Sequence, residues 1–144
     1  MKRMQDDILK VLLSEEQIAE KVAQIGRQIT EDYRDKNLLM VSVLKGSVVF
    51  MADLMRAVDC PARIDFMSVS SYGSGTKTSG VVKIVKDLDL NLEGYDLLLV
   101  EDILDSGRTL YYLREILEKR NPASIRIATL LNKPARREAD IAPD

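Results

Sequence analysis

Apolar positions along the chain fall into blocks whose spacing switches between that of buried strands and that of amphipathic helices. Two nearly unbroken apolar runs, Leu38 to Leu44 and Leu97 to Val100, are typical of strands buried on both faces of a sheet. The second run predicts a strand over residues 96–102. Shorter apolar runs predict further strands at residues 8–13, 64–69, 81–85 and 125–131.

Three segments between these runs have helical spacing. The first opens with Ser14-Glu15-Glu16-Gln17, which has the form of a capping box, and its predicted inward stripe is Ile18, Val22, Ile25, Ile29 and Tyr33. The second is predicted at residues 47–58, with Val48, Met51, Met55 and Val58 facing inward. The third is predicted at residues 107–120, where Asn121-Pro122 ends it and the inward residues are Leu110, Leu113 and Leu117.

Strands and helices therefore alternate, and this order predicts an α/β fold with a parallel sheet flanked by helices on both faces. In such sheets, ligands bind just beyond the carboxyl ends of the strands. Residues 1–144 contain no internal repeat and no linker-like segment, so we expect them to form a single domain.

Composition narrows the chemistry that this fold can carry. The chain has no histidine, which removes Ser-His-Asp catalysis and His-ligated metal sites. Its single cysteine, Cys60, is expected to be a buried thiol in a reducing cytoplasm. The net charge of −2 gives no sign of nucleic-acid binding, and no apolar run is long enough to predict a membrane span.

The segment from Leu97 to Leu110 carries the strongest functional signal. Its apolar strand is predicted to end in two adjacent carboxylates, Glu101 and Asp102, and a third acid, Asp105, follows in a short loop. Ser106-Gly107-Arg108-Thr109 then opens a helix, and the unpaired N–H groups at a helix N-terminus suit a phosphate. Residues 105–107 alone would also fit an ordinary turn with a cap.

The two adjacent carboxylates are harder to explain as purely structural. Glu101 and Asp102 repel one another, and burial at the end of an apolar strand would increase that cost. Ribose hydroxyls or a magnesium ion would offset the repulsion. The pair therefore indicates a binding site.

This pattern closely resembles the phosphoribosyl pyrophosphate motif of type I phosphoribosyltransferases, in which two acids, two hydrophobic residues, Asp, a small hydroxyl residue, Gly, any residue and Thr follow a hydrophobic strand. The amino-acid sequence of residues 101–110 is most similar to that of the 6-oxopurine branch of the family. Three further segments agree in the same order along the chain: Val43-Leu44-Lys45-Gly46 resembles the pyrophosphate loop, Ser71-Tyr72-Gly73 the start of the lid, and residues 130–137 the purine-recognition end of a strand.

The resemblance implies a role for each matching residue. Glu101 and Asp102 hold the ribose hydroxyls, partly through Mg²⁺, and Asp105 is the general base or proton acceptor near purine N7. Residues 105–109 surround the 5′-phosphate: Asp105, Ser106, Gly107, Arg108 and Thr109. Pyrophosphate contacts are implied for Leu44, Lys45, Gly46 and Arg137, lid residues are Ser71 and Tyr72, and Lys133 donates to the purine 6-oxo group. The family also has a non-proline cis peptide at the position of Leu44 and Lys45.

The implied substrates are phosphoribosyl pyrophosphate and a 6-oxopurine base, and the implied assembly is a homodimer or homotetramer. Arg136-Arg137 could instead be a solvated basic patch. Family members usually continue past the position of Asp144, so we expect an incomplete hood and weaker purine binding. Two alternatives remain open: a transferase of the same fold for another base, such as xanthine or a pyrimidine, and a non-catalytic regulator that binds phosphoribosyl pyrophosphate.

Overall fold

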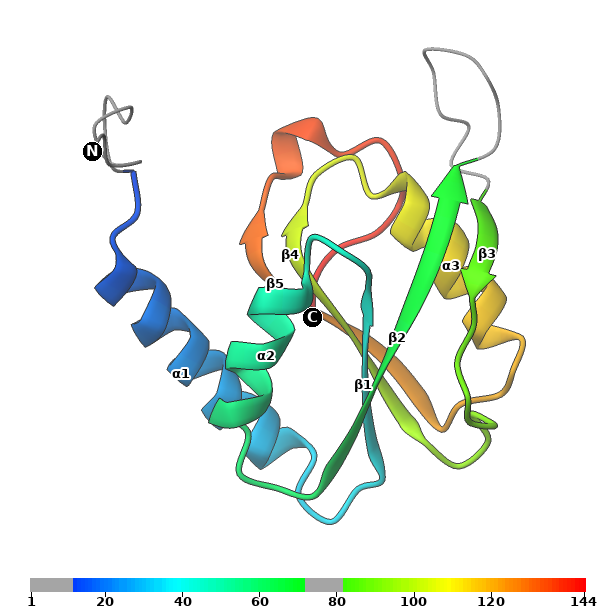
Figure 1. The fold of residues 1–144 in the computed structure, drawn as a ribbon, viewed down its shortest axis with the longest axis horizontal. Coiled ribbons are helices and arrows are strands. Elements are labelled where there is room, and N and C mark those ends of the chain that lie inside the picture. The colour runs from blue at the N-terminus through cyan, green and yellow to red at the C-terminus, as the bar shows by residue number, and fades with distance from the viewer. Residues whose placement is uncertain (1–11, 72–81) are drawn as a thin grey trace, which may run out of the picture.

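The computed structural model describes residues 12–71 and 82–144. Within these two ranges, three α-helices and a short 3-10 helix flank five strands (Figure 1). The helices are α1 (Glu15–Asp32), α2 (Val48–Ala57), α3 (Arg108–Glu118) and η2 (Pro134–Arg136). The strands are β1 (Leu38–Val43), β2 (Ala62–Ser71), β3 (Val82–Lys86), β4 (Asp96–Leu104) and β5 (Ser124–Asn132). The strand predicted at residues 8–13 lies mostly outside the described residues, and Leu12 and Leu13 form a bend.

The strands form one sheet in the order β3-β2-β1-β4-β5. Four of them, β2, β1, β4 and β5, are parallel, as the alternating pattern predicted. The expectation of a wholly parallel sheet is wrong for β3, which pairs antiparallel with β2. Only 10 residues separate the end of β2 at Ser71 from the start of β3 at Val82, fewer than a parallel crossover needs, so the chain returns beside the strand that it has just left.

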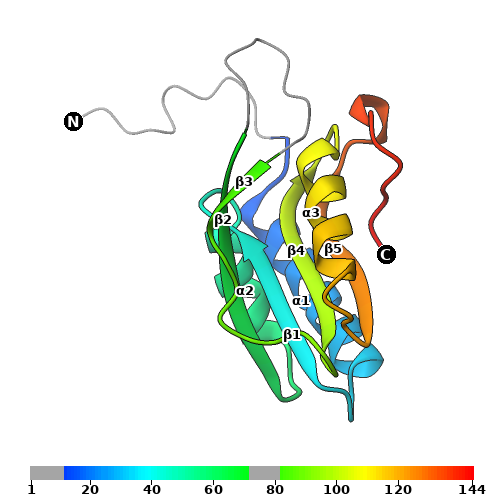
Figure 2. The ribbon, with the colours of Figure 1, turned by 90° about the vertical axis from the view of Figure 1, so that its right-hand side faces the viewer.

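The sheet separates two apolar cores, because successive strand residues point to opposite faces. Leu38 and Met40 of β1 face the layer formed by α1 and α2, whereas Leu39 and Val41 face α3. Figure 2 shows this arrangement, with α3 on one side of the sheet and α1 and α2 on the other. Central strands covered on both faces explain the unbroken apolar runs in the sequence.

The start of α1 agrees with the sequence pattern. The Ser14 hydroxyl accepts from the Gln17 backbone N–H at 3.1 Å, and the Ser14 N–H donates to the Gln17 side chain at 2.8 Å. This reciprocal pair is the predicted capping box. On the predicted stripe, Val22 and Ile29 are buried, whereas Ile18 is 37% exposed.

The burial predicted around α2 is partly wrong. Val48 and Met55 are 41% and 42% exposed, and the residues of α2 that are buried are Phe50, Met51 and Leu54. The helix begins at Val48, directly after Ser47, whose hydroxyl donates back to the Val43 carbonyl at 2.6 Å. Cys60, expected to be buried, is half-buried in the loop before β2.

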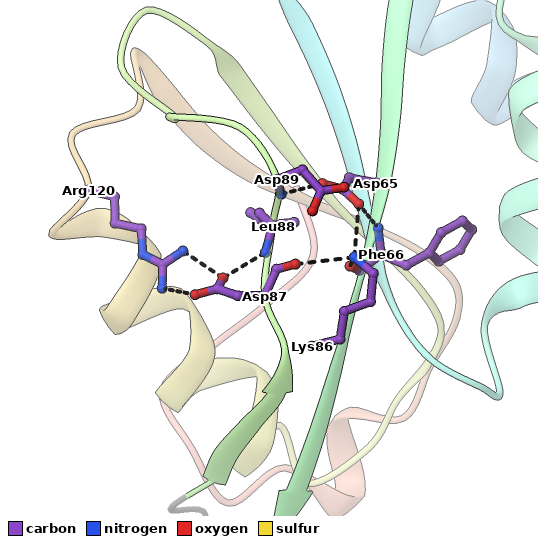
Figure 3. A network of polar contacts seen from close by, with 7 residues as sticks. All are labelled: Asp65, Phe66, Lys86, Asp87, Leu88, Asp89 and Arg120. Atoms are coloured by element: carbon purple, nitrogen blue, oxygen red, sulfur yellow. Dashed lines mark hydrogen bonds and ion pairs between the residues drawn. The ribbon is translucent and has the colours of Figure 1, made fainter.

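A network of polar contacts lies where β3 ends beside β2 (Figure 3). The Asp65 carboxylate accepts from the backbone N–H groups of Phe66 and Asp89 and from Lys86 Nζ. Lys86 Nζ also donates to the Phe66 carbonyl at 2.8 Å, at a position where β2 has no strand partner on that side. The side chains therefore satisfy strand edge groups that the ladder leaves unpaired.

The same network reaches the turn that follows α3 through a bidentate ion pair. Both carboxylate oxygens of Asp87 accept from Arg120, at 2.7 and 2.9 Å. This hydrogen bond from Arg120 is the main reason that the pKa of Asp87 is lowered, although burial opposes it. For Asp65, burial is the largest single effect and raises the pKa, but the hydrogen bonds from Asp89, Phe66 and Lys86 together outweigh it, so the pKa is lowered.

Because the pKa of Asp87 is lower in the folded chain, its ion pair stabilises the fold above the ordinary carboxyl pKa of 3.8. That contribution is lost as the pH falls through the folded value. We expect Asp87→Asn to lower the free energy of unfolding at pH 7 by about 0.5–1 kcal/mol. In this variant the free energy of unfolding should also fall less steeply as the pH is lowered from about 5 to about 3. Urea titrations at several pH values measure both effects.

The exposed i,i+3 pair of Asp53 and Arg56 provides the control. Asp53→Asn is expected to change the free energy of unfolding by less than about 0.5 kcal/mol. Equal pH dependence in the parent and in Asp87→Asn would contradict the role assigned to the Asp87–Arg120 pair.

Candidate active site

The carboxyl ends of β1 and β4 lie side by side and bring the predicted segments together. β1 ends at Val43, but β4 continues past its partner and pairs Ile103 with Leu131 and Leu104 with Asn132 of β5. The predicted end of this strand at Asp102 is therefore wrong by two residues. Glu101 and Asp102 therefore lie inside β4, close to its carboxyl end.

A cavity of about 290 Å³ opens at this edge of the sheet. It is lined by Val43, Leu44, Gly46, Ser47 and residues 101–110. Most of the predicted site residues therefore meet in one place, although their segments are more than 50 positions apart in the sequence. Lys45, Lys133 and Arg137 are not among the lining residues.

The loop after β1 has the cis peptide bond that the resemblance implied, between Leu44 and Lys45. The Leu44 N–H donates to the Met67 carbonyl at 2.8 Å, and the Lys45 carbonyl accepts from the Val48 N–H at the start of α2. Lys45 and Gly46 are exposed. The loop is thus fixed at both ends, and its middle is open to solvent.

Two buried serines support this loop, and sequence reasoning did not single them out. Ser42 and Ser47 are fully buried, and their hydroxyl oxygens lie in contact with each other. Ser42 Oγ donates to the Val100 carbonyl of β4 at 2.9 Å. The only available signal was Ser42 itself, a hydroxyl residue in an otherwise apolar strand.

The loop after β4 leads directly into α3. The Asp105 carboxylate accepts from the Ser106 N–H at 2.8 Å, and Gly107 has the left-handed φ of 75° before the helix begins at Arg108. No side chain caps the first turn of α3. Its N–H groups and positive dipole end therefore suit an anion bound in the adjoining cavity.

Glu101 and Asp102 give the cavity an acidic wall. The pKa of Glu101 is raised to about 8, first by burial and then by the charge of Asp102, while a backbone hydrogen bond from Val43 opposes the rise. Bound hydroxyl donors or a cation near Glu101 would favour its charged form and lower that pKa. The effect of the Asp102 charge on the pKa of Glu101 agrees with the repulsion expected from the sequence.

A magnesium ion fits this donor set only with help from other ligands. Among residues 12–71 and 82–144, no group of three or more His, Cys, Asp or Glu side chains could hold a metal by itself. Mg²⁺ commonly binds through one or two carboxylates and completes its shell with water and substrate oxygens. Glu101 and Asp102 supply the two carboxylates of such a site.

The remaining predicted residues lie around the rim. Lys133 follows β5, is exposed, and its backbone N–H donates to the Leu104 carbonyl at 2.8 Å. The Arg137 guanidinium instead points at backbone carbonyls of the chain itself, including that of Asp105 at 2.9 Å. Ser71 is the last residue of β2, and Tyr72 of the predicted lid lies outside the described residues.

These features define a phosphoribosyl transferase. The family model for the phosphoribosyl transferase domain matches residues 9–144, and the chain belongs to this family. It is 52% identical over 141 residues to the hypoxanthine-guanine phosphoribosyltransferase of Streptococcus pyogenes, which covers 98% of this chain and 78% of that protein. The corresponding enzyme of Streptococcus thermophilus is 51% identical with the same coverage.

Solved structures agree in fold. The hypoxanthine phosphoribosyltransferase of Staphylococcus aureus matches with a TM-score of 0.94 and 47% identity, covering 98% of this chain and 77% of that one. The hypoxanthine phosphoribosyl transferase of Trypanosoma cruzi matches with a TM-score of 0.90 and 37% identity, covering 99% and 78%. The predicted fold class, a sheet flanked by helices as in type I phosphoribosyltransferases, is therefore confirmed.

Proposed function

We propose that this chain transfers the phosphoribosyl group of phosphoribosyl pyrophosphate to hypoxanthine or guanine, releasing pyrophosphate. One observation carries the proposal: a single cavity joins the Leu44–Lys45 cis loop, two carboxylates of β4 and the open N-terminus of α3. Such a cavity offers separate places for pyrophosphate, for ribose hydroxyls and for a 5′-phosphate.

The 5′-phosphate binds at residues 105–109 in this proposal. The first-turn N–H groups of α3 donate to its oxygens, and the hydroxyls of Ser106 and Thr109 add further donors. Gly107 adopts the left-handed φ of 75° that turns the chain from the loop into α3, a conformation that glycine allows at little cost. The phosphate therefore anchors the ribose ring over β4.

Glu101 and Asp102 orient the ribose by accepting from its 2′- and 3′-hydroxyls. Mg²⁺ bound at these carboxylates would supply positive charge to the ribose and pyrophosphate oxygens. Lys45, beside the open backbone of the cis loop, adds a cation for the departing pyrophosphate. Arg137 as a pyrophosphate ligand stays a prediction.

At the purine, Asp105 manages the proton near N7 while N9 attacks ribose C1′. Lys133 donates to the 6-oxo group and disfavours adenine, which has no acceptor at that position. Catalysis then consists mostly of positioning and electrostatic stabilisation of a ribosyl cation-like transition state. The predicted lid around Ser71 and Tyr72 would exclude water from that centre.

A product assay on the 144-residue chain tests the function. The chain is incubated with phosphoribosyl pyrophosphate, Mg²⁺ and one base at a time: hypoxanthine, guanine, xanthine, adenine or uracil. We expect inosine and guanosine monophosphates as the main products. A preference for another base would favour a different transferase of this fold, and binding of phosphoribosyl pyrophosphate without any product would favour a regulator.

Lys133→Ala is expected to raise KM for hypoxanthine and guanine by roughly 10- to 100-fold, because the hydrogen bond from a charged donor is lost. KM for phosphoribosyl pyrophosphate should change by less than about threefold. Steady-state kinetics with each substrate varied in turn measure both constants. Lys119→Ala, which removes an exposed lysine next to α3, is the matched control. Equal changes in the two KM values would contradict a purine-binding role for Lys133.

We also propose that the chain forms a homodimer or homotetramer in the cytoplasm. The apolar side of α2 that faces away from the sheet supports association, because Val48, Val49 and Met55 are 41%, 68% and 42% exposed. No helix in the described parts of the chain is both long and apolar enough to cross a membrane.

A further inference from the structure

We propose that Arg137 is a positioning residue, which fixes the loop of residues 104–107 by binding its carbonyl groups. This inference rests on the proposed function, because it assumes that the loop binds the 5′-phosphate. It assigns Arg137 a role through the backbone of the loop, in place of direct contact with pyrophosphate.

The Arg137 guanidinium binds four acceptors that come from four different places. Nε donates to the Asp105 carbonyl at 2.9 Å, and Nη2 donates to the Leu104 carbonyl at 3.4 Å and to the Asn132 side chain. Nη1 donates to the Ile141 carbonyl. One planar side chain therefore links the end of β4, the phosphate loop, the end of β5 and the segment that follows η2.

Backbone bonds from the same segment continue this pattern. The Lys133 N–H donates to the Leu104 carbonyl at 2.8 Å, and the Ser106 carbonyl accepts from Glu138 at 2.9 Å and Ala139 at 3.1 Å. The three successive carbonyls of residues 104, 105 and 106 are thus all held by residues 133–139. Of the three, the Asp105 carbonyl is the one that Arg137 binds through Nε.

The direction of these carbonyls determines the direction of the loop N–H groups. In a trans peptide the carbonyl and the following N–H point in opposite directions. Holding the carbonyls of residues 104–106 toward the segment of residues 133–139 therefore turns the next N–H groups away from that segment. Residues 104–107 also line the 290 Å³ cavity, where the N–H groups of Asp105 and Gly107 would meet a phosphate, while the Ser106 N–H donates to the Asp105 carboxylate.

Close packing at Gly107 supports the same arrangement. A Cβ built on Gly107 would lie 3.1 Å from Arg137 Cδ and would overlap the Ile141 side chain. The alkyl part of Arg137 therefore packs directly on the loop while its guanidinium binds the carbonyls. The Arg108 side chain, one residue further on, forms an ion pair with Glu138 of the same segment.

Arg137→Lys separates a positioning role from a pyrophosphate-binding role. Lysine keeps the positive charge, but its single ammonium group cannot reproduce a planar fork that binds four acceptors at once. A residue that attracts pyrophosphate mainly through charge should tolerate lysine better than one that shapes a loop. The neighbouring Arg136 is exposed, so Arg136→Lys is the matched control.

Calorimetric titrations of the 144-residue chain with ribose 5-phosphate and, separately, with magnesium pyrophosphate test the proposal. We expect Arg137→Lys to weaken ribose 5-phosphate binding about 10- to 100-fold, because small errors in placing a binding group cost this much. Pyrophosphate binding should change by less than about twofold. Arg136→Lys should leave both affinities at the parent values.

Other outcomes would overturn the positioning role. Weaker pyrophosphate binding with unchanged ribose 5-phosphate binding would make Arg137 a pyrophosphate ligand. Equal loss of both affinities together with a lower Tm would make it a general support of the fold. If the parent chain binds no ribose 5-phosphate, the proposed function fails and the positioning role fails with it, whereas a parent that binds while Arg137→Lys binds equally well rejects the positioning role alone.

Asn132→Ala provides a second, milder variant if Arg137→Lys does not fold. It removes one acceptor of the Arg137 fork and leaves both loop carbonyls in place. We expect ribose 5-phosphate binding to weaken about two- to fivefold, the effect of about one net hydrogen bond or less. Unchanged ribose 5-phosphate affinity in this variant would also overturn the proposal.

Discussion

Asp105→Asn is expected to lower kcat by roughly 10²- to 10⁴-fold, the usual effect of losing a general acid–base group. The asparagine side chain has the same size, and its oxygen can still accept from the Ser106 N–H, as the Asp105 carboxylate does at 2.8 Å. The loop carbonyl that Arg137 binds belongs to the backbone and is unaffected. The substitution therefore removes the base and leaves the phosphate loop in place.

Product formation under saturating substrates measures this effect, and titration with ribose 5-phosphate provides the internal check. Ribose 5-phosphate affinity should stay within about threefold of the parent. Asp140→Asn, which neutralises an exposed acid in the nearby C-terminal segment, is the control for a general change of charge. A kcat equal to that of the parent would show that Asp105 does not handle the proton.

Strand and helix positions were predictable because each has its own apolar period, and that period is a local property of the sequence. The unbroken apolar runs of β1 and β4 are examples, and the capping box of α1 is likewise a local feature of the sequence. Strand ends and pairing direction are not local. β4 continues to Leu104 because β5 offers Leu131 and Asn132 as partners, and β3 runs antiparallel because the 10 residues between it and β2 are too few for a parallel crossover.

In the candidate site, too, some residues could be predicted from local sequence and others could not. The acids of β4 and the loop that opens α3 are contiguous in the sequence, so their motif could be seen there. The partners of Arg137 could not be predicted from the sequence. Its guanidinium contacts Leu104, Asp105 and Ile141 only because the folded chain brings these residues together. The sequence indicated only that Arg137 is a basic residue near an anion site. The acceptors that it binds are seen only in the folded structure.

Sequence alone also could not decide which residues of α2 are buried. A stripe that begins one residue earlier fits the apolar pattern equally well, because Val48, Val49, Phe50 and Met51 are all apolar. The structure selects Phe50, Met51 and Leu54 for the core. That selection reflects how α2 packs, because these three residues share one core with residues of α1 and of the sheet.

Gly107→Ala is expected to impair both folding and phosphate binding. The backbone at Gly107 has φ 75°, which costs a residue with a side chain about 1–2 kcal/mol. The new methyl group would also overlap Ile141 and press on Arg137, and such overpacking typically costs a further 1–3 kcal/mol. We therefore expect the free energy of unfolding to fall by roughly 2–5 kcal/mol in total.

Gly94→Ala separates the two causes. Gly94 has a similar φ of 84°, but a Cβ there would meet no heavy atom within 4 Å. This variant should lose only the backbone contribution, about 1–2 kcal/mol, and should bind ribose 5-phosphate as the parent does. Gly107→Ala should in addition bind ribose 5-phosphate at least about 100-fold more weakly, because the methyl group displaces Arg137 from the loop. Urea titration and calorimetry on the two variants measure these differences. If they lose equal stability and both keep the parent's affinity, the packing of residues 137–141 on Gly107 does not shape the phosphate loop.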